Sequence, residues 1–447
     1  MTKKISLSLI VLIVFGCVLL SAGLIIGVYF LFQSQKDYVP QTVKATEILP
    51  LGIQMDQVQQ EVSSIRGLSP QTDLQRALMT TAELKDTVVN DFFKNYTPEE
   101  SKQDSRLLSA LGLLNTGFDL RQFYLDLYSE QIAGYYDSES KEMYVVSDEQ
   151  FGGIERLTYS HEYTHVLQDQ YYDLERGLKL NDKNCQVETE YCAALTALVE
   201  GDATLTEQFW FLKYSTDLDK KQVSQFQESY SSPVYDSAPD YMKKDFFFPY
   251  QEGFNFVNQL YQHQEWQSVD EAYLNPPVST EQILHPEKYP SEKPVRVVLP
   301  DLLPNLGEGW SEIDRSVVGE WYSYLILSSG ISPQMRLSEN ESKIAAAGWG
   351  GDTYAYFSSD STDDYLFAWR ITWDNDQDVR EFFQAIRKYG IARWGGDYKE
   401  NENTISWNTQ NDGWITLRNS GQDVLWLMSN NDIAFKVALT TIADFGN

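Results

Sequence analysis

The chain opens with an almost unbroken apolar run, and amphipathic patterns follow it to the C-terminus. The run Ile5–Phe32 is longer than the roughly 20 apolar residues that cross a bilayer, and Lys3 and Lys4 precede it. This excess of positive charge predicts that residues 1–4 are cytoplasmic and that everything after residue 35 lies outside the membrane. Because a cleaved signal peptide has a much shorter apolar core, the sequence predicts an uncleaved, single-pass transmembrane helix.

Helical periodicity dominates the next segment, residues 38–130. Leucines and charged residues recur at helical spacing in three stretches: Thr81–Phe93, Pro98–Leu114 and Leu120–Glu130. Further along, residues 213–247 are polar and weakly periodic, which predicts a long loop before a helix that opens near Tyr250.

Between these regions the sequence predicts a hairpin and a helix. Ala133–Asp137 and Lys141–Val146 are rich in aromatic and β-branched residues, and the turn residues between them predict a β-hairpin. Val187–Leu212 has an apolar stripe at helical spacing, with small residues on a second face. These small residues predict a close approach to a neighbouring helix.

The character of the chain changes near residue 300. Trp349-Gly350-Gly351-Asp352 recurs as Trp394-Gly395-Gly396-Asp397. Strands and helices are predicted at Tyr365–Trp373, Asp376–Lys388, Gly413–Arg418, Val424–Met428 and from Asn430. We therefore predict a C-terminal α+β domain at residues 300–447 with an imperfect repeat, to which the sequence assigns no chemistry.

Charge and cysteine content narrow the possible partners. The formal net charge of −30 disfavours nucleic acid and anionic lipid as ligands. Cys17 lies in the predicted membrane span, so Cys185 and Cys192 are the only cysteines outside it. Two cysteines seven residues apart on one helix are too far apart to bridge, so a disulfide requires Cys185 to lie in the preceding loop. The sequence leaves this pairing open.

His161, Glu162 and His165 carry the strongest chemical signal. Histidines four residues apart lie on one face of a helix, so both imidazoles can reach one zinc ion. Glu162 projects roughly 100° away and can take a proton from a water whose pKa zinc lowers to about 7. The chain has only four histidines, which makes a chance match to this pattern rare.

A zinc hydrolase needs a third protein ligand. Glu200 lies on the small-residue face of the helix predicted at Val187–Leu212, and we expect it to be that ligand. The alternatives are Glu188, Glu190 and Asp202, and an ordinary solvated helix glutamate is the competing interpretation of Glu200.

The His-Glu-Tyr-Thr-His motif and the downstream Glu200-Gly201-Asp202-Ala203 resemble the gluzincin class of zinc metallopeptidases. The likeness covers about Gln131–Tyr289. It implies that His161, His165 and Glu200 bind zinc, that Glu162 is the base, and that an edge strand of the hairpin binds the substrate backbone. The whole layout is also similar to that of uncharacterised bacterial membrane-anchored proteins. One departure is Thr204, where gluzincins often have an aspartate that orients a histidine ligand.

A zinc peptidase also needs a group that stabilises the oxyanion. Tyr250 and His285 are the two candidates, and local packing or capping is the competing interpretation of each.

Together these patterns predict an α+β protein in three parts. The first part is the transmembrane anchor at residues 5–32. The second is a zincin-like catalytic domain, with its helical part at 38–130 and its core at 131–299, and the third is a separate C-terminal domain. The favoured function is an extracytoplasmic, membrane-anchored zinc peptidase that acts on proteins or peptides. The alternative is a surface binding protein with an inert zincin fold, which the intact Glu162 disfavours.

Overall fold

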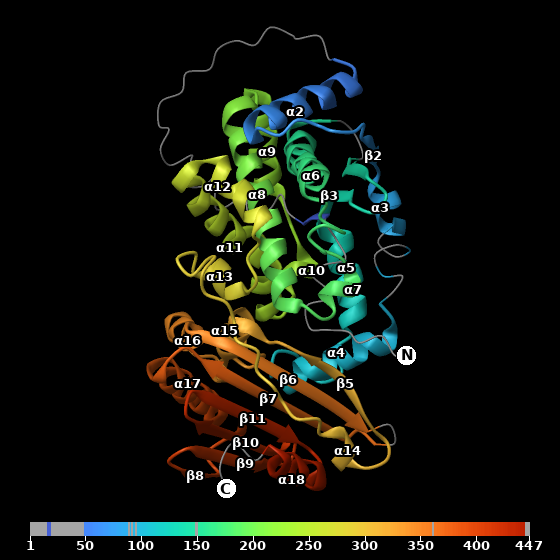
Figure 1. Cartoon of the computed structure of the whole chain (residues 1–447). Coiled ribbons are helices and arrows are strands. Elements are labelled where there is room, and N and C mark those ends of the chain that lie inside the picture. Colours follow the sequence, from blue (N-terminus) through green and yellow to red (C-terminus); the bar gives the residue numbers. More distant parts are fainter. Residues whose placement is uncertain are drawn as a thin grey trace.

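The computed structural model describes residues 16–18, 49–87, 90, 93, 96–147, 151–359 and 362–442. Figure 1 shows a mainly helical N-terminal part stacked on a C-terminal part built around a large sheet. The mixed α+β class predicted from the sequence is confirmed.

The N-terminal part contains a small sheet and most of the helices. Its helices are α2 (Leu51–Arg66), α3 (Thr81–Thr87), α4 (Pro98–Ala110), α5 (Leu120–Gln131), α6 (Gly153–Tyr172), α7 (Asp182–Cys185), α8 (Thr189–Tyr214), α9 (Asp217–Ser229), α10 (Pro233–Asp236), α11 (Asp240–Gln264), α12 (Trp266–Leu274) and α13 (Thr280–Leu284). Its strands are β1 (Gly16–Val18), β2 (Gln75–Met79), β3 (Ile132–Asp137) and β4 (Glu142–Val146).

The predicted hairpin is confirmed as β3 and β4, which pair antiparallel. The sheet order is β1-β3-β4-β2, and β2, which the sequence did not predict, pairs parallel to β4. Alternate residues of the hairpin, including Tyr136, Met143 and Val145, share a buried cluster with Leu157 and Val166 of α6. The sheet therefore fixes the position of α6.

The predicted anchor at residues 5–32 lies mostly outside the described residues. Only Gly16–Val18 of it are described. They form β1, which pairs antiparallel with β3 through Gly16 opposite Tyr135 and Val18 opposite Ile132. At these three residues the structure differs from the predicted continuous helix, because the backbone of β3 takes up their hydrogen bonds. Among the residues with described structure, no helix combines the length and apolar character that a membrane crossing requires.

The long loop predicted at residues 213–247 is wrong. This segment forms α9, α10 and the first turns of α11, and α9 begins with a reciprocal cap between Thr216 and Asp219. Val223 on α9 is buried. The segment resembled a loop because α9 is polar on average and buries only Asp219 and Val223, and because α10 buries no residue. Nor does a helix open near Tyr250, since α11 runs for 25 residues with Pro249 inside it.

Two glycines bring α8 and α11 into backbone contact. A β-carbon on Gly201 would lie 2.2 Å from the carbonyl oxygen of Gly253, and one on Gly253 would lie 2.1 Å from that of Ala197. Gly201 and Gly253 thus allow the close approach of α8 and α11 at this point.

The C-terminal part is a seven-stranded antiparallel sheet with helices on both faces. It comprises α14 (Leu303–Leu306), β5 (Trp310–Ser316), α15 (Gly319–Ser328), a 3₁₀ helix at Pro333–Met335, α16 (Glu339–Ala346), β6 (Trp349–Ser359), β7 (Tyr365–Trp373), α17 (Asp376–Trp394), β8 (Tyr398–Asn401), β9 (Thr404–Thr409), β10 (Gly413–Ser420), β11 (Asp423–Ser429) and α18 (Asp432–Thr441). The strand order is β5-β6-β7-β11-β10-β9-β8.

Side chains alternate between the two faces of this sheet. Trp369 and Trp426 face α17 in the main hydrophobic cluster, whereas Ala368 and Leu427 share a second cluster with α18. The main cluster also includes residues of α4, α8 and α11, so the two parts of the molecule share one core. The architecture changes near residue 300, but the hydrophobic core continues across this point. In its packing, the C-terminal domain is therefore continuous with the N-terminal part.

The repeated Trp-Gly-Gly-Asp motif has two different structural roles. The first copy lies in β6, where the buried Asp352 accepts hydrogen bonds from the backbone of Val318 and Gly319, at 2.8 Å each. The second copy lies at the end of α17, where Gly395 has a φ of 90° and the space beside its Cα is open. The repeat in sequence does not mark a repeat in structure at these positions.

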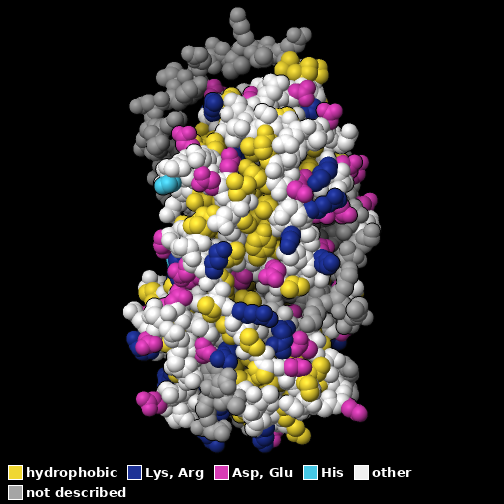
Figure 2. Space-filling model, viewed as in Figure 1, with side chains coloured by type: hydrophobic (Ala, Val, Ile, Leu, Met, Phe, Trp, Pro, Cys, Tyr) yellow, Lys and Arg dark blue, Asp and Glu magenta, His cyan; other side chains and the backbone are white. Residues whose placement is uncertain are grey.

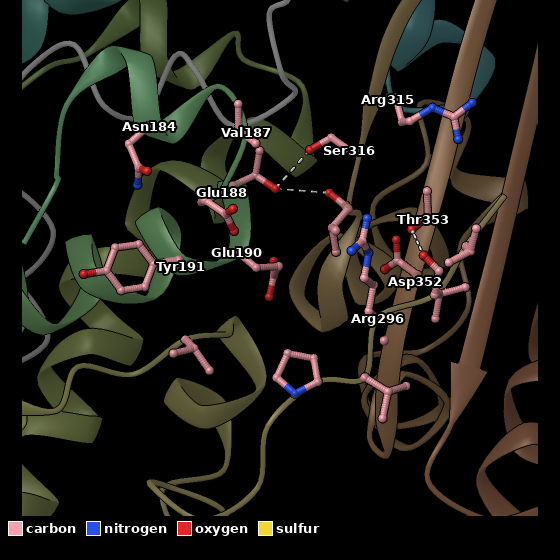
Figure 3. A pocket seen from close by; sticks show the side chains of 18 of the residues that line it. Asn184, Val187, Glu188, Glu190, Tyr191, Arg296, Arg315, Ser316, Asp352 and Thr353 are labelled. Atoms are coloured by element: carbon pink, nitrogen blue, oxygen red, sulfur yellow. Dashed lines mark hydrogen bonds between the residues drawn. The ribbon is translucent and has the colours of Figure 1, made fainter. Parts of the chain in front are cut away.

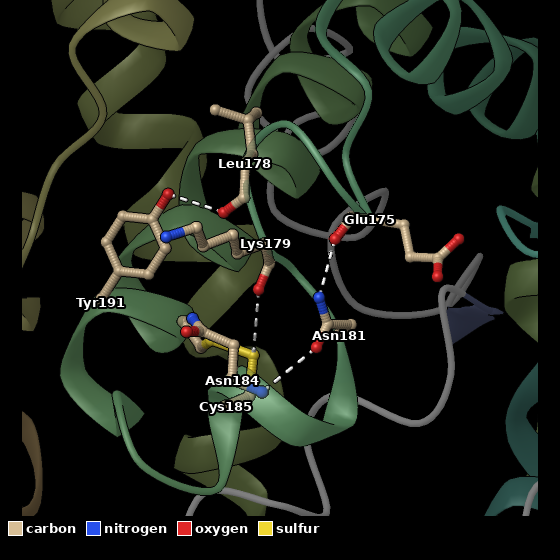
Figure 4. Close-up of a disulfide and its surroundings, with 8 residues drawn as sticks. Glu175, Leu178, Lys179, Asn181, Asn184, Cys185 and Tyr191 are labelled. Atoms are coloured by element: carbon tan, nitrogen blue, oxygen red, sulfur yellow. Dashed lines mark hydrogen bonds between the residues drawn. A yellow bond between two sulfur atoms is a disulfide. The ribbon is translucent and has the colours of Figure 1, made fainter.

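Cys185 and Cys192 form a disulfide, with their Cα atoms 5.5 Å apart (Figure 4). Cys185 ends the short helix α7, which Asn181 caps by accepting a hydrogen bond from the Asn184 amide. Cys192 lies in the first turn of α8. The bridge is possible because the two cysteines are on different helices, which settles the pairing that the sequence left open.

Buried carboxylates at the junction of the two parts make stability depend on pH. Burial raises the pKa of Glu281 to about 8, with Lys288 opposing and Glu320 reinforcing the shift. Glu281 therefore stays protonated in the folded protein at pH values between about 4.5 and 8 where it is ionised in the unfolded chain, and its contribution to stability is lost as the pH rises through this window. We expect the free energy of unfolding in urea to fall by about 1 kcal/mol or more from pH 5 to pH 8.

Glu281→Gln should flatten this dependence, whereas Glu308→Gln, at an exposed site, should not. An unchanged pH dependence in Glu281→Gln would show that other groups cause it.

Candidate metal centre

Two facing helices build a buried cluster of possible metal ligands. On α6, His161 and His165 are one turn apart and face α8, which carries Glu200. All three are buried, with exposed fractions of 2%, 0% and 2%. The structure thus brings together the three residues that the sequence nominated as ligands.

The ligand atoms converge on one point. Glu200 Oε2 lies 3.1 Å from His161 Nε2 and 3.5 Å from His165 Nε2. All three atoms lie within 4.8 Å of one another. Two imidazole nitrogens and one carboxylate oxygen form the donor set typical of catalytic zinc sites with an open fourth position.

The electrostatics of the cluster fit a bound cation. Burial alone would lower the pKa of His161, but hydrogen bonds with Glu200 and Glu207 outweigh it and raise that pKa to about 10. Burial would likewise raise the pKa of Glu200, yet the two histidines lower it to about 2. A buried carboxylate that stays ionised needs positive charge beside it. Protonated histidines supply this charge here, and a divalent metal ion held by the neutral imidazoles and Glu200 would supply it equally.

Each histidine is oriented through its second ring nitrogen. His161 Nδ1 lies 2.9 Å from Glu207 Oε2, and His165 Nδ1 lies 2.8 Å from Gln168 Oε1. Such contacts fix the imidazole so that Nε2 faces the metal. Sequence reasoning looked for this partner at Thr204 and missed Glu207, although its spacing of seven residues from Glu200 places both on one face of α8.

Asp202, an alternative ligand, instead belongs to the supporting network. It accepts hydrogen bonds from Gln168 Nε2 at 3.1 Å, Arg66 Nε at 2.8 Å and the Tyr273 hydroxyl at 2.9 Å. Arg66 comes from α2 and stacks over Trp266. Through Asp202 and Gln168, residues far apart in the sequence hold His165 in place.

The other two alternatives, Glu188 and Glu190, lie in a different part of the molecule. Figure 3 shows both in a pocket between the start of α8 and the C-terminal sheet, across from Arg296 and Asp352. Glu190 accepts hydrogen bonds from the Thr280 amide and hydroxyl, at 2.8 and 2.9 Å. Neither belongs to the cluster of His161, His165 and Glu200.

Glu162 is fully buried and faces the hairpin rather than α8. A β-carbon on Gly134 of β3 would lie 3.4 Å from Glu162 Cγ and 2.8 Å from Thr158 Cγ2. Gly134 therefore lets the strand pass close to α6 at the residue proposed as base. The charge of Glu162 also acts on His165, but its carboxylate does not belong to the ligand cluster of His161, His165 and Glu200.

The two oxyanion candidates are placed differently. The ring of Tyr250 on α11 lies 6.4 Å from that of His161, centre to centre. His285, at the end of α13, instead contacts Glu320 through Nε2 at 2.8 Å and Glu287 at 3.7 Å. Its contacts connect it to the junction of the two parts, so Tyr250 is the candidate that the structure places beside the histidines.

A second acidic group resembles a metal site but holds an ammonium group. The carboxylates of Glu281, Glu292 and Asp374 lie close together. Lys288 Nζ contacts them at 2.6, 2.7 and 2.8 Å, respectively. The ammonium group of Lys288 already occupies the position between these carboxylates, and we interpret the cluster as a junction between the two parts.

One family model matches part of the chain. A family model described as a domain of unknown function (DUF8575) matches residues 306–437, which run from the end of α14 into α18. No curated protein and no solved structure matches the chain. The matched region contains the seven-stranded sheet and excludes the metal-ligand cluster.

The contact between Glu207 and His161 predicts a measurable effect on metal binding. We expect Glu207→Gln to lower zinc affinity by about 10- to 100-fold, because the His161 ring loses its charged partner. Titration with a competing chelator measures this affinity.

Glu228→Gln on α9 is the matched control and should bind zinc like the unsubstituted protein. Equal affinity in Glu207→Gln and the control would show that Glu207 does not orient the ligand.

Proposed function

We propose that this protein is a zinc-dependent peptidase whose metal ligands are His161, His165 and Glu200. The observation that carries the proposal is the convergence of His161 Nε2, His165 Nε2 and Glu200 Oε2 in a buried site. A buried glutamate beside this cluster, on the same helix as the histidines, supplies the remaining requirement of hydrolysis.

Each residue has a defined task in this proposal. A zinc ion held by the three ligands would act as a Lewis acid and make water acidic enough to serve as a nucleophile near neutral pH. Glu162 accepts the proton released in the attack and passes it to the departing amine. Tyr250 is positioned to stabilise the negative charge that develops on the carbonyl oxygen. Glu207 and Gln168 keep the histidines oriented.

The zincin-like architecture is part of the same proposal. A hairpin packed on α6, with α8 supplying the third ligand, supports it. The edge of β3 that would bind a substrate backbone is paired with β1 in this structure. Substrate binding at β3 would therefore require β1 to give up its place in the sheet.

We propose an extracytoplasmic location on the membrane, with residues 5–32 as the anchor. This topology requires Gly16–Val18 to leave strand β1 and its pairing with β3. Lys3 and Lys4 and the length of the apolar run support this topology. The Cys185–Cys192 disulfide supports an oxidising compartment.

Substitutions of Glu162 and Glu200 distinguish the role of a catalytic base from that of a metal ligand. Glu162→Gln keeps the shape of the side chain and all three ligands, so it should retain zinc while the hydrolysis of an unfolded protein falls on the order of a thousandfold. Glu200→Gln should bind zinc much more weakly and lose activity in parallel, and excess zinc should restore part of that activity.

The outcomes also decide between the peptidase and the alternative of an inert zincin-fold binding protein. Full activity in Glu162→Gln would contradict the mechanism, and full zinc affinity in Glu200→Gln would contradict the ligand set. Zinc binding without hydrolysis in the unsubstituted protein would favour the binding protein.

A further inference from the structure

A wide pocket separates the start of α8 from the C-terminal sheet. Its volume is about 1560 Å³, and its walls include α7, the segment at residues 293–299 and parts of β5 and β6. Figure 3 shows Val187 and Glu188 on one side and Arg296 and Thr353 on the other. We call this pocket the junction groove.

Exposed apolar side chains gather in the junction groove. Val187, Leu274, Val295 and Val298 line it, with exposed fractions of 67, 80, 55 and 62%. Single exposed apolar residues are common on protein surfaces, but a group in one concave surface is typical of an interaction site. The group indicates that part of the groove binds apolar side chains.

Basic side chains in the junction groove contrast with the acidity of the whole chain. Lys179, Lys293 and Arg296 line it, whereas the formal net charge of the protein is −30. Figure 2 shows Lys and Arg side chains gathered near the junction of the two parts, with Asp and Glu scattered over the rest of this face. The groove is also lined by acidic residues: Glu188, Glu190, Asp301, Glu312 and Asp352. All of them but Glu188 accept a hydrogen bond within the protein. Lys179, Lys293 and Arg296 form no ion pair with a described residue, so unpaired positive charge exceeds unpaired negative charge and the groove favours a ligand with negative charge.

The backbone of the segment at residues 293–299 offers an open edge. The Val295 amide donates to the Gly350 carbonyl at 2.8 Å, and the carbonyls of Val297 and Leu299 accept from Thr353 Oγ1 at 2.7 Å and Arg315 Nη1 at 3.3 Å. Alternate residues of an extended chain point their amides and carbonyls to opposite sides. The backbone amides and carbonyls of Arg296 and Val298 therefore point away from the sheet.

No described residue hydrogen-bonds to the amide or carbonyl of Arg296 or Val298. An extended edge of this kind binds another extended chain by strand addition, in which backbone bonds give affinity and side chains give selectivity. The apolar and basic side chains beside it set that selectivity.

We propose that the junction groove is a docking site for an extended segment of a protein substrate that carries both acidic and apolar side chains. The backbone of this segment pairs with Arg296 and Val298, its acidic groups lie near Lys179, Lys293 and Arg296, and its apolar groups contact the exposed valines. As a substrate site, the groove rests on the proposed peptidase activity. It lies apart from the metal ligands and would bind a part of the substrate distant from the cleaved bond.

Binding is tested on the full chain carrying Glu162→Gln, so that the probe is not cleaved. The probe is a fluorescein-labelled peptide of alternating valine and glutamate, followed by fluorescence anisotropy. We expect it to bind, a peptide of alternating valine and lysine to bind at least about tenfold more weakly, and backbone N-methylation of the glutamate probe to abolish binding. Equal binding of the glutamate and lysine peptides, or full binding of the N-methylated glutamate peptide, would overturn the proposal.

A matched pair of substitutions locates the site. Arg296→Glu should weaken the glutamate probe about tenfold or more, whereas Arg380→Glu, the same charge change on the exposed face of α17, should leave it unchanged. Equal effects of the two substitutions would show that only net charge matters and would overturn the assignment to the groove.

Cleavage kinetics separate this proposal from the peptidase proposal. Arg296→Glu should raise the KM for a long, acidic unfolded protein and leave the hydrolysis of a short peptide with the same cleavage sequence unchanged. If neither substrate is cleaved by the unsubstituted protein while probe binding depends on Arg296, the peptidase proposal fails and the groove still binds its peptide. If both substrates are cleaved and Arg296→Glu changes neither KM nor probe binding, the groove proposal fails and the peptidase proposal stands.

Discussion

Glu200 carries a negative charge in the interior of the protein, and the geometry of the site follows from the need to balance it. Its carboxylate contacts the Nε2 atoms of His161 and His165, which lowers the pKa of Glu200 and raises those of the histidines. The charge can be balanced only if α6 and α8 keep their relative positions. The hydrogen-bond network of Arg66, Asp202 and Gln168 connects α2, α8 and α6. The backbone contact between Gly201 and Gly253 lets α11 support α8.

The sequence predicted the parts of this site that depend on local spacing. His161 and His165 are one helical turn apart, and the helix is long and well capped, so α6 and its histidine face follow from residues 153–172. The hairpin was equally predictable, because its two strands are rich in aromatic and β-branched residues and turn residues lie between them. Glu200 could be identified as a candidate ligand because small residues lie on the same face of the helix. Its neighbour Gly201 makes the contact with α11.

Contacts between distant segments could not be predicted in this way. Arg66 lies 136 residues before its partner Asp202, and nothing in the local pattern of α2 indicates a buried arginine. Glu207 was missed because we looked one turn after Glu200, where the structure has Thr204, and not two turns after it. The helices α9 and α10 were missed because α9 is polar on average and α10 is only four residues long, with no buried side chain. His285 was suggested by its neighbours in sequence, but its partner Glu320 comes from α15.

The most direct test of the account is X-ray absorption spectroscopy at the zinc edge on the purified full-length protein. The account predicts one zinc per chain with two imidazole nitrogens at about 2.0–2.1 Å and carboxylate oxygen at about 2.0–2.2 Å. It also predicts that the imidazole signal disappears in the His161→Ala/His165→Ala double variant. A protein that binds no zinc, or that binds it with an unchanged imidazole signal in the double variant, would contradict the central claim.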